Sequence, residues 1–177
     1  MSDADGYIYE YMNGTQNYIS VMVRIEKFLI HSNYNSPNKR AFGAMKCVQN
    51  VILQWKKARQ YYGINNTFLT TDVGRFGSTS LKNRMNSSAL TEVVEYLYSV
   101  IHGGMLSLTQ WEQSFTTIGM GQTQSPAYIA MMQKVISAKG SVLITAGSGS
   151  TFHKNTQRLH QQPHFNPQMI PLGDDCS

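Results

Sequence analysis

The chain has 177 residues, which suits one domain with tails and leaves room for a hydrophobic core. Charged residues make up 14% of the sequence, below the roughly 25% of an average soluble domain, and this weakly charged surface favours self-association. The net charge of +5 favours anionic partners, either nucleic acid or acidic lipid headgroups. The sequence shows no signal peptide and no apolar run of roughly 20 residues, so we expect membrane contact to be peripheral.

The residue types that usually catalyse reactions or bind metals form no recognisable active-site or metal-site pattern. Cys47 and Cys176 lie far apart, which indicates neither a disulfide framework nor a metal site and fits a reducing compartment. The five histidines show no ligand spacing. The segment AGSGS around Gly147 is interpreted as a Gly-Ser turn, because we expect no strand–loop–helix frame there and the lysine of a phosphate loop is missing. We therefore predict a protein without enzyme activity, metal or cofactor.

The first predicted element is a strand within YISVMVRIEKFLI, residues 18–30. Apolar β-branched side chains alternate there with Ser20, Met22, Arg24 and Glu26, which is typical of a half-buried strand. A second alternating run, GYIYEYM, precedes it, and Asn-Gly at 13–14 lies between the two runs. Because Asn-Gly favours tight turns, we expect the two runs to form a hairpin.

A long amphipathic helix follows over residues 37–62. Ser36 is suitable as its N-cap, Pro37 as its first residue and Gly63 as its end. Its apolar residues recur every three or four positions and form one stripe; these are Ala44, Val48, Val51, Trp55, Ala58 and Tyr62. A loop over residues 64–88 with a short strand near 68–73 comes next, and a second helix is expected over 89–102.

From Met105 onward the apolar residues recur less regularly. The segment MLSLTQWEQSFTTI from Met105 is expected to be extended. Residues 128–147 are interpreted as two strands joined by a turn at 138–140, with a helix over 126–137 as the alternative. Residues 151–177 show no periodicity, which indicates a flexible tail or an arm that binds elsewhere.

This order of elements predicts an α+β fold: an antiparallel sheet with two main helices packed on it, followed by a flexible C-terminal tail. Three regions follow from it. Residues 1–17 form an acidic N-terminal segment that includes the possible first hairpin strand. Residues 18–150 form a single globular domain, and residues 151–177 form the tail.

Positive charge is concentrated in one part of the chain. Between Lys39 and Arg84 there are nine basic residues and one acid, Asp72, so this segment carries a net charge of nine minus one, or +8. We interpret it as a basic patch that binds a membrane or a nucleocapsid, since such residues attract acidic lipids as well as nucleic-acid phosphates. The patch consists of Lys39, Arg40, Lys46, Lys56, Lys57, Arg59, Arg75, Lys82 and Arg84.

The order of these elements resembles that of rhabdovirus matrix proteins, in particular the plant cytorhabdovirus-like branch. The resemblance rests on a strand followed by a helix with Trp55 and a closing Tyr62-Gly63, then a loop with RFGSTSLKN, then a turn-linked pair with AKGSVLI. It covers about residues 18–146. The long basic N-terminal arm and the Pro-Pro-x-Tyr budding motif of that family are missing here.

The resemblance implies a viral matrix protein that self-associates, condenses the nucleocapsid and links it to the membrane during virion assembly and budding. Its implied partners are copies of itself, the nucleocapsid, an anionic membrane surface and a viral glycoprotein. Its implied location is the virion beneath the envelope, and host cytoplasm and endomembranes as a peripheral membrane protein. Two alternatives stay open. One is an RNA-binding coat protein of a rod-shaped plant virus, a four-helix bundle that needs residues 18–30 and 126–137 to be helical. The other is a small enzyme.

Overall fold

The structure, a computed structural model, describes residues 17–23, 37–71, 88–101, 105–106, 126–146, 151–161 and 168–172. Strands and helices alternate along these ranges. The strands are β1 (Ile19–Val23), β2 (Thr67–Thr71), β3 (Met105–Leu106), β4 (Val142–Ala146) and β5 (Gln168–Leu172). The helices are α3 (Pro37–Tyr62), α5 (Ser88–Ile101), α7 (Pro126–Lys139) and α8 (Thr151–His160).

Within the described residues the strands form one parallel sheet of five strands in the order β3-β2-β1-β4-β5. Val21 of β1 is in register with Leu69 of β2 on one side and with Ile144 of β4 on the other. Parallel neighbours need a crossover connection, and here a helix lies between each consecutive pair of strands. The order runs outward from β1 in both directions, which is the arrangement of a doubly wound α/β fold.

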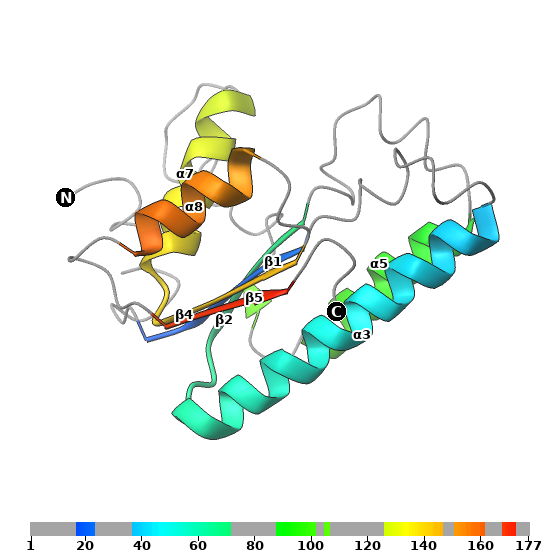
Figure 1. The fold of residues 1–177 in the computed structure, drawn as a ribbon, viewed down its shortest axis with the longest axis horizontal. Coiled ribbons are helices and arrows are strands. Elements are labelled where there is room, and N and C mark those ends of the chain that lie inside the picture. The colour runs from blue at the N-terminus through cyan, green and yellow to red at the C-terminus, as the bar shows by residue number, and fades with distance from the viewer. Residues whose placement is uncertain are drawn as a thin grey trace.

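The helices cover both faces of the sheet, so the domain has three layers (Figure 1). α3 and α5 lie on one face, whereas α7 and α8 lie on the other. All residues of β1 and β4 are buried, as expected for central parallel strands that helices cover on both sides.

The face beneath α3 and α5 carries the apolar core. Ile19, Val21 and Val23 of β1 belong to the same buried cluster as Val142, Ile144 and Ala146 of β4. Helix α3 contributes Val48, Val51 and Trp55 among others, and α5 contributes Val93, Leu97 and Ile101. Trp55 also donates its indole N–H to the Thr67 hydroxyl at 2.9 Å, so this aromatic anchor leaves no unpaired polar group.

The face beneath α7 and α8 is more polar. Ser20, Thr70 and Thr145 alternate with the apolar residues of their strands and are buried there. Gln157 of α8 donates to the Thr145 hydroxyl at 2.9 Å and thereby ties α8 to β4. His160 is fully buried at the end of α8, with Nδ1 2.9 Å from the Ala138 carbonyl and Nε2 3.0 Å from the Gln168 carbonyl. His160 therefore joins α8, α7 and β5.

Several predicted elements are confirmed. The long helix over residues 37–62 is α3, and Gly63 ends it with a φ of 65°, a conformation that suits glycine. The strand within residues 18–30 is present as β1, the strand near 68–73 as β2, and the second helix as α5. The proposed N-terminal hairpin and most of the segment after Met105 lie outside the described residues.

The predicted antiparallel sheet is wrong. The alternation in β1 was taken for one buried and one solvent-exposed face, but Ser20 and Met22 are buried beneath the second helical layer. The strand pair predicted over 128–147 is a helix followed by a strand, because α7 occupies Pro126–Lys139, as in the helical alternative for 126–137, and leads to β4. With α7 and α8, four helices rather than two pack on the sheet within the described part of the chain.

The flexible tail predicted for residues 151–177 is also wrong for much of its length. Residues 151–160 form α8, and residues 168–172 form β5, which pairs with β4 over five residues. Pro171 lies in β5 at the edge of the sheet, where a missing N–H costs no ladder hydrogen bond. The spacing of the cysteines indicated no disulfide framework, but Cys47 is buried in α3 and disulfide-bonded.

Candidate anion-binding surface

The structure places a large share of the predicted basic patch on one helix. α3 carries six basic residues and no acidic residue along its 26 positions. They are Lys39, Arg40, Lys46, Lys56, Lys57 and Arg59. Arg75, Lys82 and Arg84, the other members of the predicted patch, lie outside the described residues. α3 alone therefore carries positive charge that no acidic residue of the helix offsets.

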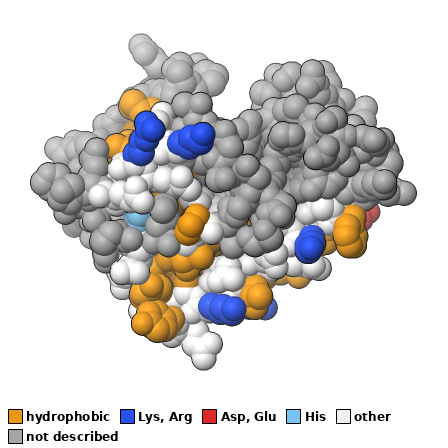
Figure 2. Space-filling model, viewed as in Figure 1, with side chains coloured by type: hydrophobic (Ala, Val, Ile, Leu, Met, Phe, Trp, Pro, Cys, Tyr) orange, Lys and Arg blue, Asp and Glu red, His pale blue; other side chains and the backbone are white. Residues whose placement is uncertain are grey.

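One side of α3 combines lysines with exposed apolar residues. We call this side the outer row and define it as Phe42, Lys46, Leu53, Lys57 and Tyr61. The intervals of four, seven, four and four residues place these side chains on one helical face. At 1.5 Å per residue the outer row extends over about 28 Å. Figure 2 shows basic and hydrophobic side chains alternating along the flank of the molecule where α3 runs.

The apolar members of the outer row are unusually accessible. Phe42 is 75% exposed, Leu53 48% and Tyr61 81%, and Lys46 and Lys57 are exposed between them. Single exposed apolar residues are common on protein surfaces, but a row of them on a helix that carries lysines is typical of a surface that binds something. The sequence-based patch missed Phe42, Leu53 and Tyr61. Their spacing relative to the lysines is the signal that could have identified them.

Not every cation of α3 belongs to this surface. The Arg59 guanidinium lies 4.8 Å from the centre of the Trp55 ring, and Arg59 donates to the Asn65 side chain at 3.2 Å. These contacts hold Arg59 against the end of the helix, so we assign it a structural role. Lys56 is exposed and lies beside the outer row.

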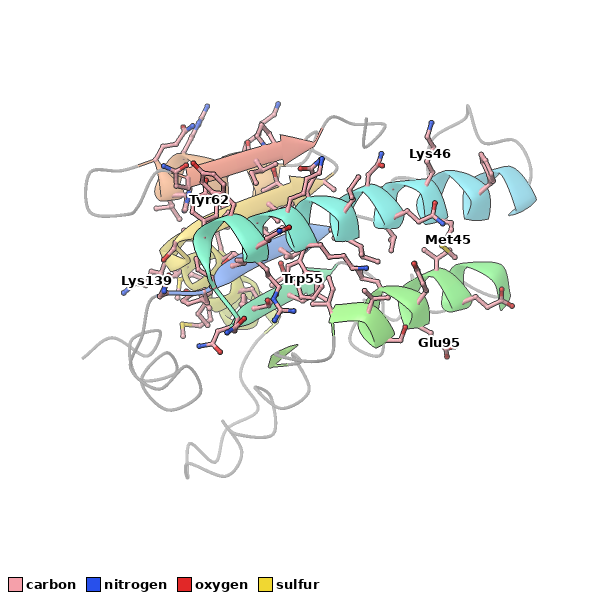
Figure 3. The ribbon with its side chains drawn as sticks, turned by 90° about the horizontal axis from the view of Figure 1, so that it is seen from below. Met45, Lys46, Trp55, Tyr62, Glu95 and Lys139 are labelled. Carbon is pink, nitrogen blue, oxygen red and sulfur yellow. The ribbon has the colours of Figure 1, made fainter. Side chains whose placement is uncertain are left out.

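The acidic residues of the neighbouring helix point elsewhere. Figure 3 shows Lys46 pointing away from α5, Met45 between the two helices, and Glu95 on the outer side of α5. Glu92 and Glu95 are exposed on α5. The side chain of Lys46 is therefore directed to solvent rather than to an acidic neighbour, and remains accessible to an external anion.

The doubly wound fold also has a position where ligands commonly bind. In such folds ligands bind beyond the carboxyl ends of the strands where the strand order reverses, which here lies between β1 and β4. β4 ends at Ala146 and α8 begins at Thr151, and the sequence between them is Gly-Ser-Gly-Ser. The strand–loop–helix frame that was thought to be missing at AGSGS is thus present, although the lysine of a phosphate loop is not.

Other kinds of site find no support among the described residues. In the described part of the chain, no group of three or more His, Cys, Asp or Glu residues is arranged to hold a metal ion. Among the helices that the structure describes, none is both long and apolar enough to cross a membrane. No protein-family model matches this chain, and a search of curated proteins finds no match to its sequence.

Proposed function

We propose that this protein binds an anionic membrane surface through the outer row of α3. The observation that carries the proposal is the alternation of lysines with highly exposed apolar side chains on a helix without a single acidic residue. A helix with this composition binds in the plane of a membrane interface, where apolar side chains enter the headgroup boundary and lysines attract acidic lipids.

The apolar residues favour a membrane over nucleic acid. Phosphate contacts alone would use Lys46, Lys56 and Lys57 and would leave Leu53 in water. Insertion into the headgroup boundary instead removes apolar surface from water, which contributes about 25 cal/mol for each Å². Each lysine near an acidic membrane adds about 1 kcal/mol. Apolar burial and the attraction of the lysines contribute together only at a partner with an anionic surface and an apolar interior, as in a membrane.

The role in virion assembly that the resemblance to matrix proteins implies is one setting for such binding, and it stays a prediction. The turn-linked strand pair that formed part of the resemblance is a helix and a strand, so our proposal is based on α3 alone. The four-helix bundle requires residues 18–30 and 126–137 to be helical; α7 meets the second requirement, but residues 19–23 form β1.

Flotation with lipid vesicles tests the proposal. The full chain is mixed with vesicles of phosphatidylcholine, with and without phosphatidylserine, at low and high salt. The double variant Lys46→Gln/Lys57→Gln removes two charges from the outer row. At about 1 kcal/mol each, their loss weakens binding to anionic vesicles by about 30-fold.

A matched control removes two charges from the opposite layer. Lys154 and Arg158 are exposed on α8, so Lys154→Gln/Arg158→Gln makes the same change in net charge away from α3. This variant is expected to bind within about threefold of the parent, since long-range attraction is screened over about 8 Å at physiological salt. If both variants lost the same affinity for anionic vesicles, the effect would depend on net charge alone and not on the outer row. Binding to RNA but not to anionic vesicles would favour the coat-protein alternative.

The reversal of strand order supports a second candidate, a small phosphate-bearing ligand at the carboxyl ends of β1 and β4. The Gly-Ser-Gly-Ser sequence before α8 favours it, because glycine permits a close approach and a helix N-terminus attracts anions. Thermal denaturation of the full chain with ATP, NAD or inorganic phosphate at millimolar concentration tests this candidate. A rise in Tm with ligand concentration supports it, and an unchanged Tm with all three contradicts it.

A further inference from the structure

The exposed side of α5 carries negative charge only. We call this side the acidic face and define it as Glu92, Glu95, Tyr96 and Ser99, which are all exposed. The intervals of three, one and three residues place these side chains on one face of the helix. Glu92 and Glu95 are the only acidic residues in the part of the chain that the structure describes. α5 has no basic residue along its 14 positions, so its own helix does not offset this charge.

The acidic face is complementary to the outer row of α3. The outer row combines Lys46 and Lys57 with exposed apolar side chains, of which Leu53 is 48% exposed. The acidic face combines two carboxylates with Tyr96, which is 38% exposed. Each surface thus presents charge of one sign beside accessible apolar atoms, and the two signs are opposite. Surfaces matched in this way attract each other and select the correct partner.

Within one copy the outer row and the acidic face do not face each other. α3 and α5 pack together through their buried sides. Figure 3 shows Lys46 pointing away from α5 and Glu95 on the outer side of α5. The positive and the negative surface therefore lie on opposite sides of the α3–α5 layer, and both remain accessible to a second copy. A contact between two different surfaces leaves one of them free on each copy, so further copies can add.

We propose that copies of this chain associate head to tail, with the acidic face of α5 of one copy on the outer row of α3 of the next. The inference goes beyond membrane binding, because the partner is a second copy of the chain and no lipid takes part. The contact consists of exposed ion pairs and a small apolar area. It is therefore weak, reversible and sensitive to salt.

Sedimentation velocity of the full chain without lipid tests the association. At low salt we expect the weight-average sedimentation coefficient to rise with protein concentration beyond the value of a dimer, and at high salt to stay at that of a monomer. Glu92→Gln/Glu95→Gln should weaken the association about tenfold, since each exposed ion pair contributes up to roughly fivefold. A parent chain that remains monomeric at low salt, or that stops at a dimer, overturns the proposal.

Mixing two variants tests which surfaces meet. Glu92→Gln/Glu95→Gln keeps the outer row, and Lys46→Gln/Lys57→Gln keeps the acidic face, so each variant alone should associate more weakly than the parent. An equal mixture should form pairs with the affinity of the parent and no longer series, because each variant contributes its one intact surface. A mixture that associates no better than either variant alone overturns the proposal.

A control variant and vesicle flotation complete the test. Lys154→Gln/Arg158→Gln removes two charges from α8 and should associate within about threefold of the parent; a tenfold loss would assign the effect to net charge and refute the contact. If Glu92→Gln/Glu95→Gln associates like the parent while Lys46→Gln/Lys57→Gln binds anionic vesicles more weakly, the association is refuted and the proposed function stands. If mixing restores association but the parent does not float with anionic vesicles, the proposed function fails and the association stands.

Discussion

Gly140 is the position where a single methyl group should disturb the fold most clearly. It lies between α7 and β4, at the point where the chain passes the start of β1. A Cβ atom at this residue would lie 2.6 Å from the Ser20 Oγ, 3.0 Å from the Tyr18 Cε2 and 3.1 Å from the Tyr18 carbonyl oxygen. Tyr18 is fixed there, because its carbonyl accepts from the Ser141 N–H at 2.9 Å and its hydroxyl donates to the Ile136 carbonyl.

We expect Gly140→Ala to lower the free energy of unfolding by about 2–3 kcal/mol, within the range found for overpacked cores. The shortest contact is to a side-chain oxygen, so Ser20→Ala should relieve part of it. The Ser20 hydroxyl has no hydrogen-bond partner among the described residues, so Ser20→Ala alone should change stability little. The double variant should recover about 1 kcal/mol, and the contacts to Tyr18 account for the remainder.

Urea unfolding of the parent, both single variants and the double variant measures this coupling. Equal stability of Gly140→Ala and the parent would show that β1 does not approach the α7–β4 connection as closely as described. A double variant in which the two effects simply add would assign the strain to Tyr18 alone and contradict the contact with Ser20.

The remaining predictions concern one buried contact and one turn. His160→Ala should lower the free energy of unfolding by about 2–4 kcal/mol, because a buried ring that contacts the Ala138 and Gln168 carbonyls is removed. Hydrogen exchange should show faster opening of β5 than of β1. Gly63→Ala should cost about 1 kcal/mol and Gly63→Asn less, because the residue has positive φ with open space around its Cα, and thermal unfolding measures the difference. An Ala variant at Gly63 as stable as the Asn variant would contradict this explanation.

α3 was predictable because its capping residues and its apolar stripe indicate the same helix. Its apolar stripe, the proline at its start and the glycine after its end all indicate the same helix, and the core residues Val48, Val51 and Trp55 lie on that stripe. α5 was predicted for the same reason. α3 buries one face against the sheet and against α5, and α5 buries one face against α3, whereas their other faces are accessible. A 3.6-residue period is typical of helices with one buried and one accessible face.

The topology was not predictable from the pattern of single strands. β1 alternates between β-branched residues and Ser20 or Met22, and this pattern is typical of a strand with one face in water. In the folded protein both faces are buried, and the second face tolerates hydroxyl groups beneath α7 and α8. α7 was mistaken for a strand because its β-branched and small residues carry little helical periodicity. Once α7 is a helix, the alternation of strands and helices favours a parallel sheet.

The C-terminal region was mistaken for a tail because its polar residues are buried by specific contacts. His160 is buried and Gln157 is half-buried, although both are polar, because they contact carbonyl and hydroxyl partners from α7, β4 and β5. The lysines of the outer row could be assigned to a basic patch from the sequence. Their combination with Phe42 and Leu53 required knowing which side of α3 packs against the sheet.

Fluorescence quenching at residue 53 tests membrane binding through α3 most directly. Leu53→Trp places an indole in the middle of the outer row, and Arg158→Trp places one on α8 in the opposite layer. With anionic vesicles that contain lipids brominated in their acyl chains, we expect the added indole at residue 53 to be quenched and the one at residue 158 to fluoresce as it does with unbrominated lipids. Equal quenching at both positions, or quenching at residue 158 alone, would contradict the outer row as the membrane-binding surface.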